Sequence, residues 1–211
     1  MNGFDRIDSQ NIEEYLNGNE NALELVIERY FRAVYSFVYR LVGNKQDAND
    51  IAQEVFVKVW KNIKKYKTSQ KFKAWLFAIA KNTSIDWLRK KKEEVFSEFE
   101  NEDGESVLEN NLIDPAPLAD KIIARAEKAK SLEKLLEKLP INYRAVLVLK
   151  YEEGFTFEEI GEVLEKPLNT VKSQYRRALI ALRGLLAGDT HQKSFSSRIK
   201  EYGEELREAF Q

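Results

Sequence analysis

Three carboxylates are spaced so that together they could bind a metal ion. Asp47, Asp50 and Glu54 lie at positions i, i+3 and i+7, so a helix would place them on one face. Grouped carboxylates can bind a divalent cation, and such a metal could support a nuclease reaction. No second cluster of oxygen ligands and no catalytic partner accompanies them in the sequence. We therefore expect no metal here, and an acidic docking face or a merely solvated one instead.

The amino-acid composition excludes many of the remaining classes of enzyme. The 211 residues include no cysteine and one histidine, His191, which excludes disulfide scaffolds, zinc sites, thiol nucleophiles and most histidine-based acid-base catalysis. No GxxxxGK phosphate loop is present. No stretch approaches 18 uncharged apolar residues, and the start of the chain is acidic rather than signal-like. The sequence predicts a cytoplasmic protein without membrane insertion, catalytic residues or cofactors.

Charge is segregated along the chain although the net charge is only -1. Residues 20–92 carry a net +9, residues 93–120 a net -10 and residues 121–187 a net +4. A polyanion responds to such local blocks rather than to their sum. The basic blocks are therefore candidate phosphate-binding surfaces, and a solvated lysine-rich face is the alternative for residues 61–92.

The acidic block also marks a domain boundary. Residues 93–120 are polar and close with two prolines, so they read as a flexible tether between two folded parts. No alternating strand pattern flanks a hairpin turn. We predict an all-α protein with small helical domains at 10–92 and 121–187. An apolar stripe over 188–211 predicts a further amphipathic helix as a C-terminal extension.

Three helices are expected in the first domain. Apolar residues recur at three- and four-residue steps from Leu23 to Leu41, and Gly43 is a stop signal. A second helix follows Asn44, a candidate N-cap, and its apolar stripe comprises Ile51, Val55, Val59 and Trp60. A third runs from Phe72 to the basic residues 89–92, with Trp75 and Trp87 favoured as core residues.

The second domain contains a helix-turn-helix pattern. Thr156 and Glu159 fit a capping box at the start of one helix, Pro167 interrupts the chain, and Asn169 is a candidate cap for the next helix. That second helix has a basic outer face formed by Lys172, Ser173, Arg176 and Arg177. The arrangement is typical of a helix that enters the DNA major groove, although helical hairpins also occur in proteins that bind no nucleic acid.

Three motifs together resemble the extracytoplasmic-function class of the sigma-70 family of bacterial RNA polymerase sigma factors. They are DANDIAQEVFVKVW at 47–60, FKAWLFAIAKNTSIDWLRKKK at 72–92 and LPINYRAVLVLKYEEGFTFEEIGEVLEKPLNTVKSQYRRAL at 139–179. The resemblance covers about residues 10–187. It implies that the two domains are sigma region 2 and sigma region 4, with core RNA polymerase and promoter DNA as partners. The family often has an anti-sigma protein, and the sequence leaves open whether one binds this chain.

The resemblance also implies roles for individual residues. Polymerase docking would fall on Asp47, Asp50, Gln53, Glu54 and Lys58. Recognition and opening of the minus-10 element would fall on Tyr66, Lys67, Lys71, Lys81, Asn82 and Asp86. Contacts with the minus-35 element would fall on Thr170, Lys172, Ser173, Arg176 and Arg177. Family members often have arginine where this chain has Gln174 and Leu179, which leaves the preferred minus-35 sequence open.

The function implied is promoter selection and DNA opening on behalf of core polymerase. Without a nucleotide-binding loop, binding energy must offset the few kcal/mol that extruding a base costs. A stand-alone helix-turn-helix regulator is the alternative, and it would bind a duplex operator unaided, usually as a symmetric dimer.

Overall fold

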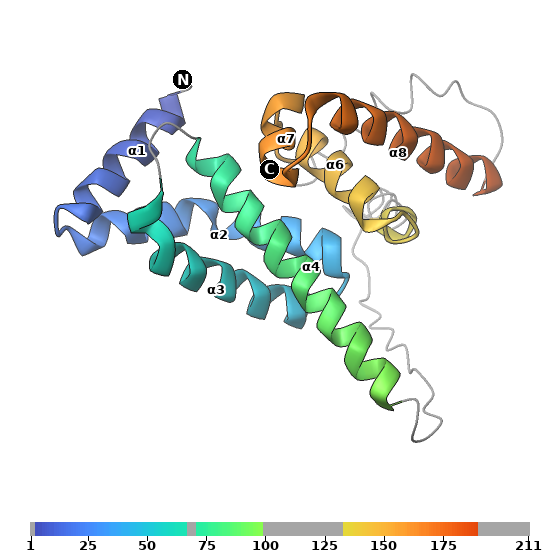
Figure 1. Cartoon of the computed structure of the whole chain (residues 1–211), viewed down its shortest axis with the longest axis horizontal. Helices are drawn as coiled ribbons and strands as arrows, with labels where there is room; N and C mark the ends of the chain where they lie inside the picture. The colour runs from blue at the N-terminus through green and yellow to red at the C-terminus, as the bar shows by residue number, and fades with distance from the viewer. Residues whose placement is uncertain (1–2, 67–70, 99–132, 190–211) are drawn as a thin grey trace, which may run out of the picture.

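The structure, a computed structural model, describes residues 3–66, 71–98 and 133–189, and these contain helices and no strand (Figure 1). The helices are α1 (Gly3–Leu16), α2 (Glu20–Val42), α3 (Lys45–Asn62), the short 3-10 helix η1 (Ile63–Lys65), α4 (Phe72–Glu98), α6 (Ile141–Tyr151), α7 (Phe157–Leu164) and α8 (Leu168–Asp189). Residues 133–137 are also helical. The expected all-α fold is confirmed for this part of the chain.

The junction between α2 and α3 follows the expected local rules. Gly43 adopts a left-handed conformation with φ of 78°, and its N–H donates to the carbonyl oxygen of Tyr39 at 2.8 Å. The Asn44 side chain then accepts from the backbone N–H groups of Gln46 and Asp47 at 2.9 and 3.0 Å. Both the predicted stop at Gly43 and the predicted cap at Asn44 are confirmed.

Helix α1 packs across α2 and was not expected from the sequence. Ile12 is fully buried in this contact, and the buried carboxylate of Asp8 accepts hydrogen bonds from Arg29 and Tyr30 of α2. A buried carboxylate is tolerated here because it has both a cation and a hydroxyl as partners. The first domain is therefore a bundle of α2, α3 and α4 with α1 lying across it.

The apolar stripe of α3 is confirmed except at Trp60, which is 57% exposed. Trp60 lies nine residues after Ile51, and a rotation of about 100° per residue places it on the opposite side of the helix. Phe56 fills the buried side instead, and its ring stacks on that of Phe31 with the centroids 5.8 Å apart. The expectation that Trp60 shares the buried stripe was wrong.

Helix α4 is longer than the sequence suggested. It continues to Glu98, six residues into the segment expected to be a tether. Its first half is buried in the bundle through Phe72, Leu76 and Phe77, whereas its last turns extend away from the other helices (Figure 1). Residues 99–120 of the expected tether and the predicted helix at 188–211 lie outside the described residues, apart from 188–189 at the end of α8.

The capping box of the second domain is confirmed. The Glu159 N–H donates to the Thr156 hydroxyl oxygen at 3.2 Å, and the Glu159 carboxylate accepts from the Thr156 N–H at 2.6 Å. Helix α8 starts at Leu168, so Asn169 lies inside its first turn. The expectation that Asn169 is the cap was wrong, because the carbonyl of Pro167 already accepts the first helical hydrogen bonds.

The two domains pack against each other. Helix α7 lies on α4 and α6 lies on α2, so that segments far apart in the sequence are neighbours (Figure 1). The rings of Phe77 and Phe155 meet edge to face across this junction, with their centroids 5.4 Å apart. The Arg144 guanidinium donates to the carbonyl oxygens of Arg40 and Leu41 at 3.2 and 3.0 Å, which ties the end of α2 to the second domain.

In none of the described helices does an apolar run reach the length and hydropathy that a bilayer crossing requires.

Candidate nucleic-acid interface

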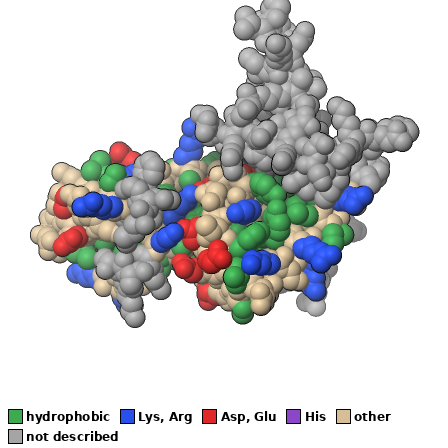
Figure 2. Space-filling model, turned by 90° about the horizontal axis from the view of Figure 1, so that it is seen from above, with side chains coloured by type: hydrophobic (Ala, Val, Ile, Leu, Met, Phe, Trp, Pro, Cys, Tyr) green, Lys and Arg blue, Asp and Glu red, His purple; other side chains and the backbone are tan. Residues whose placement is uncertain are grey.

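The outer face of α8 is basic and exposed. Its inner face is buried through Val171, Ala178 and Leu182. The five side chains expected to contact DNA, all of them exposed, are Thr170, Lys172, Ser173, Arg176 and Arg177. In the part of the chain that the structure describes, no ion pair is formed by the three cations of this set. In the space-filling view, the end of the molecule where α8 lies carries mainly Lys and Arg side chains among its charged ones (Figure 2).

A tight turn fixes α8 relative to α7. Glu165 adopts a left-handed conformation with φ of 54°, and the Lys166 N–H donates to the Gly161 carbonyl oxygen at 2.9 Å. A Cβ atom on Gly161 would lie 2.9 Å from the Lys166 carbonyl oxygen, so only glycine fits there without a shift. The Phe157 and Tyr175 rings then pack 5.0 Å apart between the two helices. The exposed face of α8 is therefore held on a rigid support.

Two polar groups on the inner side of α8 differ in their partners. The hydroxyl groups of Tyr175 and Tyr151 are 2.6 Å apart and share a hydrogen bond. Burial is the main cause that raises the pKa of Tyr151, and this hydrogen bond is the second. The side-chain oxygen of Gln174 is buried and has no hydrogen-bond partner among the described residues. Gln174 is one of the two positions at which the sequence departs from the arginine that is frequent in the resembled family.

The residues expected to meet the minus-10 element fall into two groups. Tyr66 is only 8% exposed, and its ring packs on those of Phe72 and Trp75 with centroids 5.6 and 5.2 Å apart. Lys67 lies outside the described residues. Asp86 is exposed and pairs with Arg89 one turn further along α4 at 3.3 Å. Of the described residues in this group, Tyr66 is thus engaged by aromatic rings and Asp86 by a neighbouring arginine.

Lys71, which directly precedes α4, and Lys81 and Asn82 of α4 contact α7 and the turn that follows it. The Lys71 ammonium lies 2.6 Å from a carboxylate oxygen of Glu159. The side chains of Lys81 and Asn82 reach one carboxylate oxygen of Glu165, at 3.5 and 3.1 Å. Each of the three is thus engaged by an acidic residue of the second domain.

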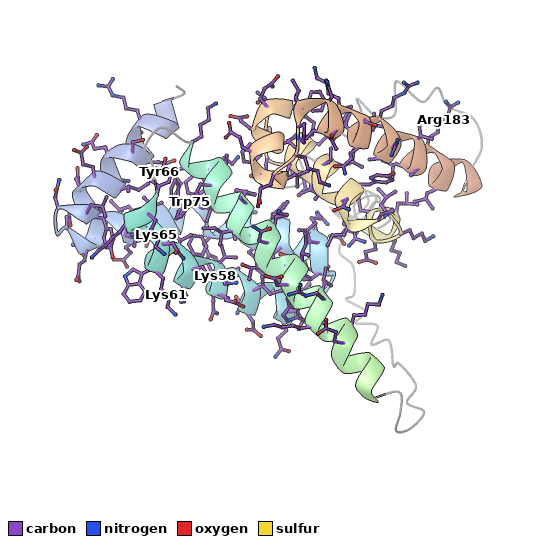
Figure 3. The ribbon with its side chains drawn as sticks, viewed as in Figure 1. Lys58, Lys61, Lys65, Tyr66, Trp75 and Arg183 are labelled. Carbon is purple, nitrogen blue, oxygen red and sulfur yellow. The ribbon has the colours of Figure 1, made fainter. Side chains whose placement is uncertain are left out.

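Further lysines lie at the end of α3 and in η1. Lys61, Lys64 and Lys65 are exposed. Figure 3 shows Lys61 and Lys65 near the end of α3, with Tyr66 and Trp75 close by toward α4. Basic side chains next to aromatic rings are the composition of a surface that binds single strands.

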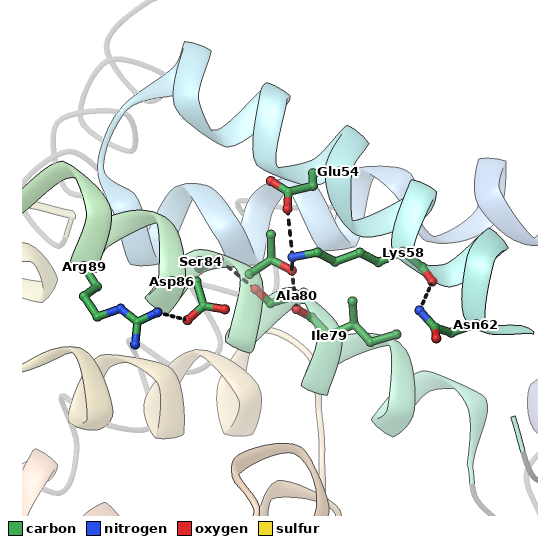
Figure 4. A network of polar contacts seen from close by, with 9 residues as sticks. Glu54, Lys58, Asn62, Ile79, Ala80, Ser84, Asp86 and Arg89 are labelled. Carbon is green, nitrogen blue, oxygen red and sulfur yellow. Dashed lines mark hydrogen bonds and ion pairs between the residues drawn. The ribbon is translucent and has the colours of Figure 1, made fainter. Parts of the chain in front are cut away.

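The expected docking residues on α3 divide into exposed and engaged side chains. Asp50 and Gln53 are exposed, whereas Asp47 pairs with Lys91 of α4 at 3.0 Å. Glu54 pairs with Lys58 at 2.8 Å, and the Lys58 ammonium also donates to the Thr83 hydroxyl oxygen at 3.1 Å (Figure 4). Asp47 and Lys58 therefore help to hold α3 against α4.

The carboxylates of α3 do not assemble with other ligands. Over the described ranges, no group of three or more His, Cys, Asp or Glu side chains is arranged to hold a metal ion. Asp47 and Glu54 each face a lysine instead.

Two exposed apolar residues on α3 were not recognised from the sequence. Val57 and Trp60 follow Asp50 and Gln53 at helical spacing and extend the same exposed stripe. The signal was available, because Val57 lies off the stripe defined by Ile51. Large exposed apolar side chains of this kind are frequent at protein–protein contacts.

Both domains match known families. Residues 26–94 match sigma-70 region 2, and residues 129–182 match sigma-70 region 4. The chain is 34% identical over 173 residues to the ECF RNA polymerase sigma factor SigW of Bacillus subtilis (strain 168), an alignment that covers 82% of this chain and 92% of SigW. The chain belongs to the extracytoplasmic-function sigma factors. Its function is that of an RNA polymerase sigma factor, and its partners are core RNA polymerase and promoter DNA.

Another relative agrees with this assignment, and two solved structures share the fold. The sigma factor is 27% identical over 176 residues to the RNA polymerase sigma-H factor of Pseudomonas aeruginosa. The alignment covers 83% of this chain and 91% of the sigma-H factor. Its fold is similar to RpoE in complex with the anti-sigma factor NepR from Bartonella quintana, with a TM-score of 0.60, 23% identity and coverage of 79% and 98%. It is also similar to CnrH in complex with the cytosolic domain of CnrY, with a TM-score of 0.62, 22% identity and coverage of 88% and 98%. At these identities the two structures support the fold alone.

Proposed function

We propose that the sigma factor divides promoter recognition and polymerase docking among three surfaces. The exposed face of α8 would bind the minus-35 element in the major groove. The face of α4 around Lys71, Lys81 and Asn82, together with Tyr66, Lys67 and Asp86, would bind the minus-10 strand. The exposed stripe of α3 would dock on the large polymerase subunit.

The minus-35 role rests on one observation. Lys172, Arg176 and Arg177 are exposed on a single face of the second helix of a helix-turn-helix, and none of them is neutralised by a described acid. Arginine can bind guanine with two parallel hydrogen bonds in the major groove, and lysine adds phosphate affinity. Thr170 and Ser173 would add hydroxyl contacts to phosphate or base edges from the same face.

The minus-10 role uses binding energy without a catalytic step. The ammonium groups of Lys71 and Lys81 would attract strand phosphates, and the Asn82 amide can both donate to and accept from a base edge. Each captured base contributes on the order of 1–3 kcal/mol, which offsets the cost of unstacking it. The proposal makes the protein a regulatory subunit rather than an enzyme, acting in the cytoplasm where the polymerase works.

The docking role covers more of α3 than the sequence indicated. Asp50, Gln53 and Glu54 would supply the polar contacts, and Asp47 and Lys58 would support them through α4. We add Val57 and Trp60 to this surface, because a partner helix would remove both from water.

A test separates this proposal from a stand-alone regulator. A promoter duplex is selected from genomic fragments transcribed by core polymerase plus this protein, and its gel shift is measured with and without core polymerase. A sigma factor requires polymerase for a stable complex and for transcription. If no fragment is transcribed, or if the protein alone binds its duplex as tightly as it does with core polymerase, the proposed mechanism is contradicted.

An anti-sigma protein is a further candidate partner. The RpoE of the similar structure is bound to one, which supports the proposal without extending to this chain's own partner. The test is whether a tagged chain, isolated from its own cells before induction, carries a stoichiometric partner that blocks its transcription with core polymerase.

A further inference from the structure

The exposed face of α8 contains a large apolar side chain. Ile180 is 61% exposed, which is more than any other large apolar side chain in the part of the chain that the structure describes. Isoleucine on the surface of a helix is favoured neither by burial nor by helix propensity, which is higher for alanine, lysine and glutamate. A single exposed apolar residue is common on protein surfaces, so its position relative to its neighbours decides what it indicates.

Ile180 lies inside the basic face of α8. At about 100° per residue, it is rotated by about 40° from Arg176 and by about 60° from Arg177, which places it between the directions of these two residues. It follows Arg176 by about 6 Å along the helix, at about 1.5 Å per residue. Arg183 is exposed further along α8 (Figure 3), so the basic face continues past Ile180.

One turn after Ile180, the same face carries no side chain. Gly184 is exposed, and a Cβ atom at this position would contact no described atom outside the adjacent backbone of the helix. Gly184 is not among the described glycines with a positive φ. Neither packing nor backbone conformation therefore requires glycine here, although glycine destabilises a helix relative to alanine. Its effect is to leave this part of α8 open to the close approach of another molecule.

The charges around Ile180 indicate which molecule covers it. Promoter DNA is a partner of the protein, and its phosphates complement the charges of Arg176, Arg177 and Arg183. The major groove is about 12 Å wide and admits a helix, so base edges can reach the centre of the basic face. The apolar group that bases present in this groove is the 5-methyl group of thymine.

We infer that Ile180 contacts the 5-methyl group of a thymine in the minus-35 element and makes the sigma factor prefer an A·T pair at that position. This inference rests on the proposed placement of α8 in the major groove. Bases of one strand are about 3.4 Å apart, so a helix that lies along the groove places this thymine about two base pairs from the base that Arg176 contacts.

Removal of one methyl group from the DNA tests the inference. Deoxyuridine pairs as thymidine does and lacks only the 5-methyl group. In a promoter transcribed by core polymerase plus this protein, each thymine of the minus-35 element is replaced in turn. Binding by the full chain assembled with core polymerase is then measured in competition with the unmodified duplex. The same series is measured with Ile180→Ala and with the control Leu25→Ala, whose position on α2 is 54% exposed.

At one thymine, we expect the replacement to weaken binding by the wild type about fourfold, which is about 0.8 kcal/mol for one apolar carbon. Ile180→Ala should bind the unmodified promoter about fourfold less tightly than wild type. It should be insensitive to the replacement at that thymine, because the partner of the methyl group is already missing. Ile180→Val should keep most of the sensitivity, and Leu25→Ala should behave like wild type.

Three results would overturn the inference. The first is an equal loss in wild type and Ile180→Ala at every sensitive thymine, since another residue would then contact the methyl group. The second is a promoter series in which no thymine is sensitive. The third is weaker binding of Ile180→Ala to core polymerase without DNA, combined with unchanged sensitivity to the methyl group, which would assign Ile180 to a protein contact.

Arg176→Ala distinguishes these failures from a failure of the proposed function. If this variant alters the preference at one base pair while Ile180→Ala does not, α8 reads the major groove and the inference alone is wrong. If neither variant alters a preference, the placement of α8 in the groove and the inference are both wrong.

Discussion

Replacing Glu152 with glutamine should remove a specific pH dependence of stability. Glu152 lies at the junction between the domains, where its side chain is 5% exposed and accepts a hydrogen bond from the Arg40 Nε atom at 3.0 Å. Burial raises the pKa of Glu152 to about 7, against the opposing charge of Arg40. Glutamine keeps an oxygen for Arg40 and does not titrate.

The sign follows from comparing the two states. The folded protein binds a proton at Glu152 more tightly than the unfolded chain does, whose pKa is near the usual value of 4.5. The contribution of this group to the free energy of unfolding is therefore greatest below that value. It falls as the pH rises toward 7 and is constant above it. A shift from 4.5 to about 7 corresponds to about 3 kcal/mol, at about 1.4 kcal/mol for each pKa unit.

Urea unfolding followed by circular dichroism at pH 5, 6, 7 and 8 measures this effect. Groups that titrate in both proteins cancel when wild type is compared with Glu152→Gln. Because part of the effect lies below pH 5, the difference should change by about 2.5 kcal/mol in favour of the variant between pH 5 and 8. Glu158→Gln, at an exposed position, should show no such change. A constant difference, or one that moves in favour of wild type with rising pH, would mean that Arg40 outweighs burial and would refute the argument.

Three further outcomes are expected. Arg176→Ala should cost about 1–3 kcal/mol at one base pair of the minus-35 element and relax specificity there; equal losses on all sequences in a competition assay would make it a phosphate contact. Trp60→Ala should weaken binding to core polymerase by about 2 kcal/mol in a titration while leaving the urea midpoint unchanged, and unaltered binding would remove Trp60 from the docking surface. Thr156→Ala should lower the free energy of unfolding by about 1 kcal/mol because α7 loses its cap, whereas Thr156→Ser should retain most of it.

The sequence predicted what depends on neighbouring residues. The stop at Gly43, the cap at Asn44 and the capping box of Thr156 each follow from contacts within about four positions, so local chemistry is sufficient. The basic face of α8 follows from helical spacing alone. Asn169 failed because Pro167, two residues earlier, already occupies the N-cap position, where its carbonyl oxygen accepts from the N–H groups of Thr170 and Val171.

The packing of the two domains could not be predicted in this way. The contact of Lys71 with Glu159 joins residues 88 positions apart, and no spacing rule relates them. Glu159 and Glu165 meet bases of α4, and the helical spacing of these acids gives no sign of such partners. Trp60 failed for a different reason, because helical spacing places it opposite Ile51 and only the usual burial of large aromatic residues favoured the apolar stripe.

The edge-to-face meeting of Phe77 and Phe155 bears on how the molecule can be dissected. A truncated chain ending after α4 would present Phe77 to water, and the complementary fragment would present Phe155. Each fragment would thereby expose an aromatic side chain that is buried in the intact protein. Self-association of the separate fragments would therefore result from the truncation and would say nothing about the oligomeric state of the intact protein.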